Sequence, residues 1–450
     1  MQLRDYQQAA ITDIRQAFTQ HRRVLYQLPT GSGKTVIFCE IARQAVAKGK
    51  RVLVIVHRQE LLRQTIAKVS AACIPWGAIA PGYSMQLDWP LQIAMVQTAA
   101  RRDIGQYDLI ICDEAHHAVA GSWHAIIETQ PQAYILGVSA TPCRMDGKGL
   151  SDAFDVLLEG VTMRELIEAG YLCAPKVYAA SVADVSGVRK LGGDYNRGEL
   201  DAAMDKPKIT GDAVAEYRKL ADGKPAIVFC VSVQHAERVA DMFRAEGYRA
   251  EAVDGSLPDD ERKRRINGLA DGSVQVLTSC DIVSEGTDIP AVECAILLRP
   301  TQSEALYLQQ VGRALRPVPG KQHAVILDHA GNVFRHGMPT AAREWTLDGR
   351  PKQAKQQAVE AVRQCKQCYA VHQAAFCPEC GAKAPEKPRK VKQVAGQLVP
   401  IEDVERAKRE AKVEVWGAKS LEELKAIAFR RGYKPGWAWH RWQMYNKSRA

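Results

Sequence analysis

Short apolar runs alternate with longer amphipathic segments from the start of the chain. Five apolar runs are predicted to be strands, at Val24–Leu28, Arg51–Val56, Gln92–Val96, Asp108–Cys112 and Ala133–Val138. The segments Val36–Ala47 and Arg58–Ala71 between them are typical of helices. Strands that alternate with helices predict a parallel sheet covered on both faces. Because ligands bind beyond the carboxyl ends of such strands, polar residues at these ends should converge on one cleft.

The same alternation is repeated after a polar, irregular stretch at 184–223. A new strand begins near Pro175, and four further strands are predicted at Ala226–Val231, Arg249–Val253, Val274–Thr278 and Ala295–Leu298. We place the boundary between the two patterns near residues 170–175. The chain is therefore predicted to be an α/β protein with two tandem parallel-sheet domains, 1–172 and 173–348.

A glycine-rich loop joins the first predicted strand to the first predicted helix, and its sequence is Pro29-Thr30-Gly31-Ser32-Gly33-Lys34-Thr35. Glycines let successive backbone N–H groups curl around a phosphate, and the following helix points its positive dipole end at the same anion. Lys34 is placed to reach the β- and γ-phosphates of a nucleotide, and Thr35 to ligate Mg²⁺. The usual P-loop pattern begins with a glycine where this chain has Leu28. The alternative is a tight strand–helix turn with an incidental lysine.

An acidic pair, Asp113 and Glu114, follows the predicted strand Asp108–Cys112. In a chain with a P-loop, the first acid is a candidate to position Mg²⁺ and the second to orient or deprotonate the attacking water. The bland alternative is a solvated acidic turn. His116 could be a metal ligand together with His117, but a pair of histidines without further ligands favours a polar link to a neighbouring segment.

Gln7 lies in a predicted helix just before the P-loop strand. Its amide both donates and accepts hydrogen bonds, which matches the N6 and N7 edge of adenine. The position ahead of a P-loop is what makes this residue a candidate.

These motifs resemble those of superfamily 2 helicases of the DEAD/DEAH type. The P-loop looks like motif I, Asp113-Glu114-Ala115-His116 like motif II and Ser139-Ala140-Thr141 like motif III. The resemblance assigns Ser139 and Thr141 to the coupling of ATP hydrolysis to movement on nucleic acid. The resemblance implies two RecA-like domains and a nucleic-acid-dependent ATPase that uses ATP and Mg²⁺. It also implies contacts to nucleic acid from six residues, His57, Arg58, Gln97, Thr98, Ser232 and Thr278.

Two constellations in the second half extend the resemblance over residues 1–335. The segment Asp281–Pro290 resembles motif V, and the resemblance assigns its Gly286 and Asp288 to nucleotide binding. The segment Gln309–Arg316 resembles motif VI, with Gln309 in place of the histidine of many relatives. Arg313 and Arg316 lie three residues apart, so on one helix they would project from the same face. They are candidates for arginine fingers from the second domain, and a basic surface helix is the alternative.

Within the superfamily, the chain is most similar to RadD-like and prophage-encoded DNA helicases. The similarity rests on Ser139–Arg144, on Leu298-Arg299-Pro300-Thr301 and on the cysteine-rich tail. It implies an ATP-dependent DNA helicase or translocase that acts on single-stranded or branched DNA in repair. An RNA helicase and a non-unwinding ATPase that clamps or loads a partner remain alternatives, because the same motifs serve all three.

Four cysteines in the tail form two Cys-x-x-Cys pairs, at Cys365, Cys368, Cys377 and Cys380. Four thiolates suit tetrahedral Zn²⁺ and leave no open position, which predicts a structural zinc ribbon over residues 360–385. A redox pair is the alternative. The other eight cysteines are scattered, which is typical of a reducing cytosol, and a cytoplasmic location is expected.

The basic charge of the chain is concentrated in the last hundred residues. Residues 351–450 hold 21 Lys and Arg against 10 Asp and Glu, whereas the first 350 hold 40 against 41. This distribution indicates a polyanionic partner or simply a soluble basic tail. No apolar run approaches about 18 residues, so no membrane span is expected.

Residues 386–450 are predicted to form a basic linker and a helical tail. Trp437, Trp439 and Trp442 fall on its last helical segment. They suit either an aromatic and basic module for nucleic acid or the small core of a helical hairpin. The tail is also a candidate contact for repair or replication proteins.

Overall fold

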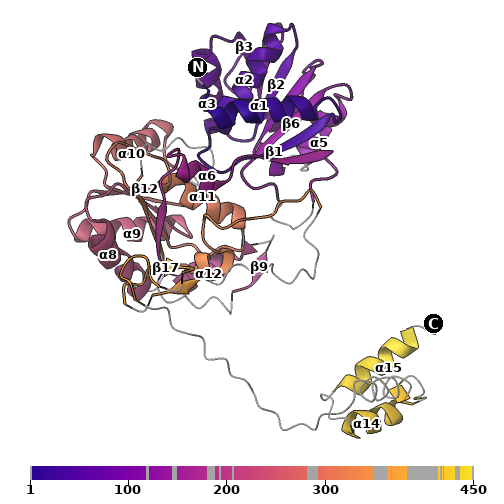
Figure 1. Ribbon diagram of the computed structural model, residues 1–450, viewed down its shortest axis with the longest axis vertical. Coiled ribbons are helices and arrows are strands. Elements are labelled where there is room, and N and C mark those ends of the chain that lie inside the picture. Colours follow the sequence, from indigo (N-terminus) through magenta and orange to yellow (C-terminus); the bar gives the residue numbers. More distant parts are fainter. Residues whose placement is uncertain are drawn as a thin grey trace. The chain divides into compact units, whose positions relative to one another are not determined.

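The computed structural model of the protein describes residues 3–117, 121–143, 149–179, 188–191, 194–204, 207–280, 292–348, 362–365, 367–374, 376–382, 414–415, 418, 420–430 and 436–447. The chain divides into two compact units, 1–384 and 385–450. The first unit contains both α/β domains (Figure 1).

The first domain is built on a seven-stranded sheet in which every strand pair is parallel. The strand order is β3-β4-β2-β5-β6-β1-β7. The strands are β1 (Arg23–Gln27), β2 (Val52–Val56), β3 (Trp76–Ile79), β4 (Leu91–Met95), β5 (Leu109–Asp113), β6 (Tyr134–Ser139) and β7 (Val156–Glu159). β2 and β5 are buried along their whole length, as expected of strands covered on both faces.

Separate hydrophobic clusters lie on the two faces of this sheet. One cluster packs α1 (Asp5–Ala17), α2 (Lys34–Ala47) and α3 (Gln59–Ala71) against the strands. The other includes residues of α4 (Val96–Ala99) and α5 (Gly121–Glu128). The covered central strands place their carboxyl ends, and the loops that follow them, at one edge of the sheet.

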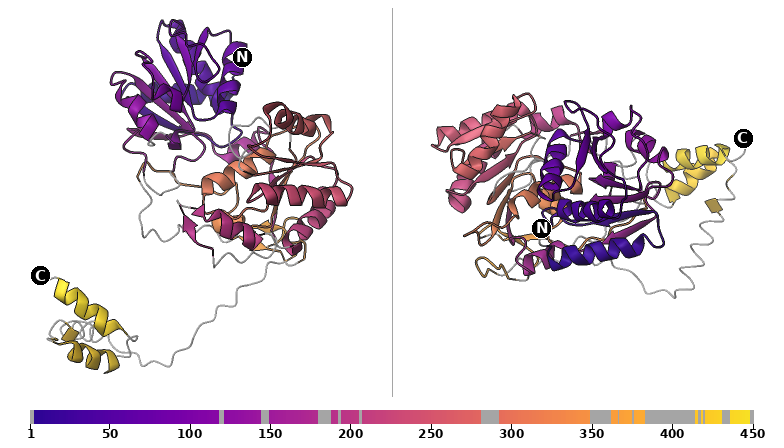
Figure 2. Two further views of the ribbon diagram at one scale, coloured as in Figure 1. Left: turned by 180° about the vertical axis from the view of Figure 1, so that it is seen from behind. Right: turned by 90° about the horizontal axis from the view of Figure 1, so that it is seen from above.

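The second domain repeats this plan with a six-stranded parallel sheet, seen from two further sides in Figure 2. The strand order is β12-β13-β11-β14-β15-β8. The strands are β8 (Pro175–Ala179), β11 (Ala226–Phe229), β12 (Ala250–Val253), β13 (Val276–Ser279), β14 (Cys294–Leu297) and β15 (Ala324–Asp328). The accompanying helices include α7 (Arg197–Met204), α8 (Pro207–Ala221), α9 (Val233–Ala245), α10 (Asp259–Asp271), α11 (Glu304–Ala314) and α12 (Asn332–His336). The prediction of two tandem parallel-sheet domains is confirmed.

Several contacts connect the two domains besides the chain that links them. Arg63 of α3 donates to Asp259 of α10 over 2.6 Å, and Arg262 of α10 donates to Glu60 of α3 over 3.2 Å. After α12 the chain returns to the first domain, where the Leu347 carbonyl oxygen accepts from the Leu150 N–H over 2.7 Å. These contacts join the two sheets at points remote in sequence.

The cysteine-rich segment packs against the second domain, at the sheet edge formed by β8. Its two short strands, β16 (Arg363–Gln364) and β17 (Val371–His372), pair antiparallel. Tyr178 of β8 forms an isolated bridge with Ala370, and Lys176 pairs with Glu379 over 2.7 Å. The segment therefore covers an otherwise open strand edge.

The second unit contains a helical hairpin of α14 (Leu421–Arg430) and α15 (Trp437–Lys447). A small cluster that includes Leu424 and Ile427 forms its core, and Trp437 and Trp442 pack against that core. Trp439, in contrast, is 53% exposed. Trp437 and Trp442 thus contribute to the core of the hairpin, and a role of the exposed Trp439 in binding nucleic acid stays a prediction.

Candidate active site

The P-loop follows β1 and leads directly into α2. Gly31 and Gly33 have φ angles of +86° and +81°, which lie in the left-handed region that favours glycine. Gly33 is the N-cap of α2, and no side chain caps this end of the helix. The Val36 N–H donates to the Gly33 carbonyl oxygen over 2.9 Å, so the N–H groups of Lys34 and Thr35 and the helix dipole are those that would face an anion.

Two hydroxyl groups of the loop support this interpretation. The Oγ1 of Thr30 and the Oγ of Ser32 are buried and have no hydrogen-bond partner among the described residues. A buried hydroxyl without a partner costs about 1–3 kcal/mol, so a ligand that supplies the missing partner would be favoured. The loop therefore fits a phosphate chain, with Lys34 and Thr35 at the first positions of α2.

Gln7 lies against the P-loop from the side of α1. Its Nε2 donates to the Ser32 carbonyl oxygen over 3.4 Å, and its Oε1 accepts from the Arg4 N–H over 3.0 Å. A Cβ at Gly33 would come within 2.8 Å of this Nε2. Gln7 thus supports the loop in this structure, and recognition of adenine stays a prediction.

The acidic pair stands at the carboxyl end of β5. Asp113 is buried, and its Oδ1 accepts a hydrogen bond from the Glu114 N–H over 3.0 Å. Burial, followed by the nearby Glu114 carboxylate, raises the pKa of Asp113, and Lys34 acts against this shift. A cation at Asp113 would reduce the cost of a buried carboxylate, so the position fits Mg²⁺ together with the Thr35 hydroxyl.

Glu114 has an unusual backbone conformation. Its φ is +52°, one of three positive values among the described non-glycine residues. Such a conformation costs about 1–3 kcal/mol and persists where the surroundings impose it, which is common at functional sites. Its Oε2 lies 3.5 Å from Nδ1 of His116.

His116 connects the acidic pair to the end of β6. Its Nδ1 lies 3.2 Å from the Ser139 Oγ, which also accepts from the Thr141 N–H over 3.2 Å. The expected polar link from His116 to a neighbouring segment is therefore confirmed. Thr141 is buried, and its Oγ1 has no hydrogen-bond partner among the described residues.

α11 of the second domain faces the P-loop. A Cβ at Gly312 would lie 2.7 Å from the Thr30 Cγ2. Gln309 is 4% exposed, and neither polar atom of its amide has a hydrogen-bond partner in the described part of the chain. Arg313, also buried, lies one residue after Gly312.

Arg316 departs from the predicted geometry. The sequence suggested one helix for Arg313 and Arg316, but α11 ends at Ala314 and Leu315 is its C-cap. Arg316 therefore lies beyond the helix, and the spacing rule for one helical face does not apply to it. Gly286 and Asp288, the two candidates in the segment resembling motif V, lie outside the described residues.

The predicted nucleic-acid residues occupy the carboxyl ends of strands but differ in accessibility. His57 and Arg58 follow β2, and Gln97 and Thr98 follow β4 in α4; all four are at least partly exposed. Thr278 of β13 is completely buried, and its hydroxyl donates to the Ala236 carbonyl oxygen over 2.7 Å. The Thr278 hydroxyl is therefore hydrogen-bonded in the interior of the domain, and its contact with nucleic acid stays a prediction.

Ser232, the remaining candidate of this group, has two local partners. Its hydroxyl caps α9 by accepting from the His235 N–H over 3.0 Å and donates to Asp201 over 2.8 Å. These bonds make it a structural N-cap here. Contact with nucleic acid stays a prediction for it.

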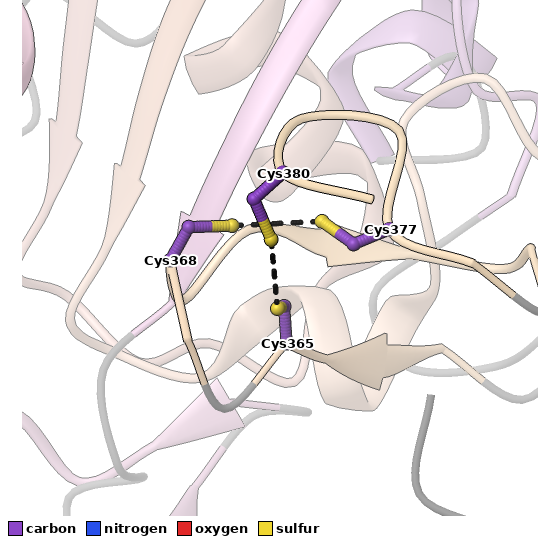
Figure 3. A group of neighbouring side chains, drawn as sticks. All are labelled: Cys365, Cys368, Cys377 and Cys380. Atoms are coloured by element: carbon purple, nitrogen blue, oxygen red, sulfur yellow. Dashed lines mark hydrogen bonds between the residues drawn. The ribbon is translucent and has the colours of Figure 1, made fainter. Parts of the chain in front are cut away.

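The four tail cysteines lie together (Figure 3). All four sulfur atoms are within 4.8 Å of one another, and the pairs Cys365–Cys380 and Cys368–Cys377 are each 3.5 Å apart. Tetrahedral Zn–S bonds of about 2.3 Å place sulfur atoms about 3.8 Å apart, so the cluster fits a zinc ion. No aspartate, glutamate or histidine joins this group among the described residues.

Sequence reasoning missed two groups next to the site. Leu172, at the junction of the domains, reaches to 3.0 Å from where a Gly31 Cβ would lie, and Tyr171 packs on Tyr6 with ring centroids 5.3 Å apart. Lys321 binds the backbone near Arg316. Neither group belongs to a motif or a periodic pattern, so the sequence contains no signal for them.

Comparisons with known proteins agree with the motifs. Residues 1–144 match the family described as type III restriction enzyme, res subunit, and residues 206–318 match the helicase conserved C-terminal domain. A 51.5 kDa protein of a Lactococcus phage is 33% identical over 396 residues, which cover 87% of this chain and 82% of that protein. IRC3 of Saccharomyces cerevisiae, grouped by its name with ATP-dependent helicases, is 31% identical over 73% of this chain. The chain spans only 51% of IRC3.

A more distant relative and a solved structure extend the comparison. The DNA 3'-5' translocase XPB2 of Sulfurisphaera tokodaii is 26% identical, over 70% of this chain and 79% of that protein. The structure of the ATP-dependent type ISP restriction-modification enzyme LlaBIII bound to DNA superposes with a TM-score of 0.56 at 18% identity. This likeness covers 73% of this chain and 27% of that one, and it shows a shared fold.

Proposed function

Because this chain belongs to the superfamily 2 helicases, ATP-hydrolysing enzymes that depend on nucleic acid, we propose that it acts on DNA as a helicase or translocase. The relevant DNA is single-stranded or branched. The activity would couple ATP hydrolysis to movement of the two domains along a bound strand.

The approach of α11 to the P-loop is the observation that carries the proposal. Gly312 leaves no room for a side chain against Thr30, and Gln309 and Arg313 are buried on the same helix. A nucleotide cradled by the P-loop would therefore lie between groups of both domains. Such a site can assemble and come apart as the domains close and open, which is what coupling requires.

Each candidate residue has a chemical role in this proposal. Lys34 would hold the β- and γ-phosphates, and Glu114 would orient or deprotonate the attacking water. Arg313 and Arg316 would neutralise charge on the transferred group, an effect worth about 10³–10⁵ in rate in related chemistry. The link from His116 to Ser139 and Thr141 would connect ATP hydrolysis to the residues that bind nucleic acid.

Metals have two separate roles in the proposal. Thr35 and Asp113 would hold Mg²⁺, which when bound neutralises phosphate charge. The four cysteines would hold a structural Zn²⁺ that fixes the cysteine-rich segment against β8. Four thiolates with no open ligand position do not suit a catalytic role.

The choice of DNA rests on three observations. XPB2 is named a DNA translocase, LlaBIII is a DNA-bound enzyme of the same fold, and the net charge of +11 in residues 351–450 suits a polyanion. An RNA helicase and a non-unwinding remodelling ATPase are the alternatives. Repair or replication proteins are proposed partners of the tail. No described helix is long and apolar enough to cross a membrane.

Parallel displacement assays separate these candidates. DNA and RNA duplexes with matched single-stranded overhangs are incubated with the protein and ATP, together with a single strand that carries a bound streptavidin block. Displacement of DNA strands or of the block from DNA supports the proposal. Activity restricted to RNA, or ATP hydrolysis without either displacement, would replace it with one of the alternatives.

A further inference from the structure

The backbone of Arg316 is held by groups that lie outside α11. α11 ends at Ala314, so Arg316 lies two residues beyond the last residue of the helix. The last carbonyl oxygens of a helix need partners from elsewhere. Their partners in this protein come from a lysine seven residues beyond the helix and from the junction between the domains.

Lys321 is the main partner. Its Nζ donates to the Arg316 carbonyl oxygen over 2.9 Å and to the Ala314 carbonyl oxygen. The intervening carbonyl, that of Leu315, accepts from the Cys173 N–H over 2.8 Å. Three successive carbonyls between the end of α11 and Arg316 are therefore fixed, and a cation at a helix C-terminus also favours the helix dipole.

The same ammonium group reaches a second segment. Its Nζ donates to the carbonyl oxygen of Val292 over 2.8 Å. Val292 lies two residues after the segment that resembles motif V, which ends at Pro290. The Lys321 side chain thus bridges the backbone just after α11 and the backbone just after the segment that resembles motif V.

Three carbonyl acceptors thus satisfy all three donors of the Lys321 ammonium group. Burial lowers the pKa of Lys321, so the charge is kept at a cost that its three acceptors offset. A lysine of this kind is expected where the backbone must be held in one position.

We propose that Lys321 is a positioning residue for ATP hydrolysis, which acts by holding the backbone of Arg316 so that its guanidinium can reach the nucleotide. The proposal rests on the role given to Arg316 in the proposed function. Lys321 itself does not touch the reacting atoms. It would therefore affect turnover and its stimulation by nucleic acid, but not ATP binding by the first domain.

Five variants test this: Lys321→Met, Lys321→Arg, Lys219→Met, Arg316→Ala and the double variant Arg316→Ala with Lys321→Met. Lys219→Met is the control, because this lysine of the same domain lies on α8, where it pairs with Glu216 over 3.9 Å. ATPase is measured with and without a single-stranded DNA or RNA oligonucleotide, whichever stimulates the unchanged protein. ATP affinity and thermal unfolding are measured in parallel.

We expect Lys321→Met to lower stimulated kcat about tenfold or more, as the loss of charge-assisted hydrogen bonds would. ATP affinity should stay unchanged, Lys321→Arg should recover part of the rate, and Lys219→Met should match the unchanged protein. The double variant should be no slower than Arg316→Ala alone, because both act through one group. If Lys321→Met unfolds below the assay temperature, Lys321→Gln, which keeps an N–H donor, replaces it.

Two outcomes would overturn the inference. One is a folded Lys321→Met protein with full stimulated turnover while Arg316→Ala loses it. The other is a double variant in which the two losses multiply. If Arg316→Ala itself retains full stimulation, the arginine role in the proposed function fails instead, and stimulation by RNA alone rejects only the DNA assignment.

Discussion

Gly312 of α11 faces Thr30 of the P-loop so closely that a Cβ on the glycine would lie 2.7 Å from the Thr30 Cγ2. Contacts of this length do not occur between unstrained carbon atoms, so any larger residue at position 312 would push the two domains apart. The glycine is therefore explained by the approach of the domains and not by a turn.

We predict that Gly312→Ala reduces ATP turnover by about 10²-fold, because a displacement near 1 Å at reacting groups has such an effect. Alanine favours a helix by about 1 kcal/mol over glycine, so the second domain should not lose stability. Gly198→Ala in α7 is the matched control, since its Cβ would meet nothing closer than 3.7 Å. Steady-state ATPase and thermal unfolding of both variants decide. Normal turnover in Gly312→Ala would show that the close approach is not needed for hydrolysis.

Lys34→Ala and Glu114→Gln should both abolish ATP turnover but differ in ATP binding. Lys34 would contact phosphate before the reaction, so its loss should weaken affinity, whereas Glu114 would act on the attacking water. Glu114→Gln should therefore bind ATP normally and remain in the closed state. Nucleotide-binding titrations distinguish the two. An equally strong loss of affinity in both variants would reject the role given to Glu114.

The ion pair between Arg63 and Asp259 should contribute to closure of the domains. Arg63→Glu places two acids together and should raise the ATP KM about fivefold, the scale of an exposed ion pair worth up to about 1 kcal/mol. The double variant Arg63→Glu with Asp259→Arg should restore the ATP KM of the unchanged protein. Because exposed pairs are screened, the effect should shrink in about 1 M salt. If the double variant is worse than either single change, the pair does not act across the domains.

Zinc should stabilise the second domain as well as the cysteine-rich segment, because this segment packs on β8. We expect one zinc per chain by elemental analysis, and we expect Cys377→Ser to lose it. The thermal midpoint of the first unit should fall by about 4 °C or more, which corresponds to about 1–2 kcal/mol in a domain of this size. Cys73→Ser, an exposed cysteine outside the cluster, serves as the control. Zinc-free protein with an unchanged midpoint would contradict a structural metal.

The tail tryptophans should separate into two functions. Trp439→Ala should weaken binding of single-stranded DNA by about 1–3 kcal/mol and leave the hairpin folded, as loss of one stacking surface would. Trp442→Ala should reduce helical signal and make residues from Ser420 onward sensitive to protease. Circular dichroism, limited proteolysis and DNA titration test both. Unchanged DNA affinity in Trp439→Ala would point to a protein partner for the tail.

The motif chemistry and the layout of the two sheets could be predicted because they are local in sequence. A strand, a glycine-rich loop ending in Gly33-Lys34 and a helix are consecutive, and an apolar strand that ends in Asp113 is equally readable. The two paired cysteine motifs also lie within sixteen residues. Sequence patterns of this kind record how a segment folds with its immediate neighbours.

Only the tertiary structure decided what depends on distant segments. β7 and β15 are short apolar runs that no adjacent motif marks. The carbonyl oxygens beyond the end of α11 are bonded by Lys321 and by the Cys173 N–H, which are remote from the helix in sequence or lie outside it. Thr278 is polar, but it is buried against α9, where its hydroxyl donates a hydrogen bond to the Ala236 carbonyl oxygen. These outcomes depend on which backbone groups the fold leaves without partners and which remote side chains reach them, and this information is distributed over the whole chain.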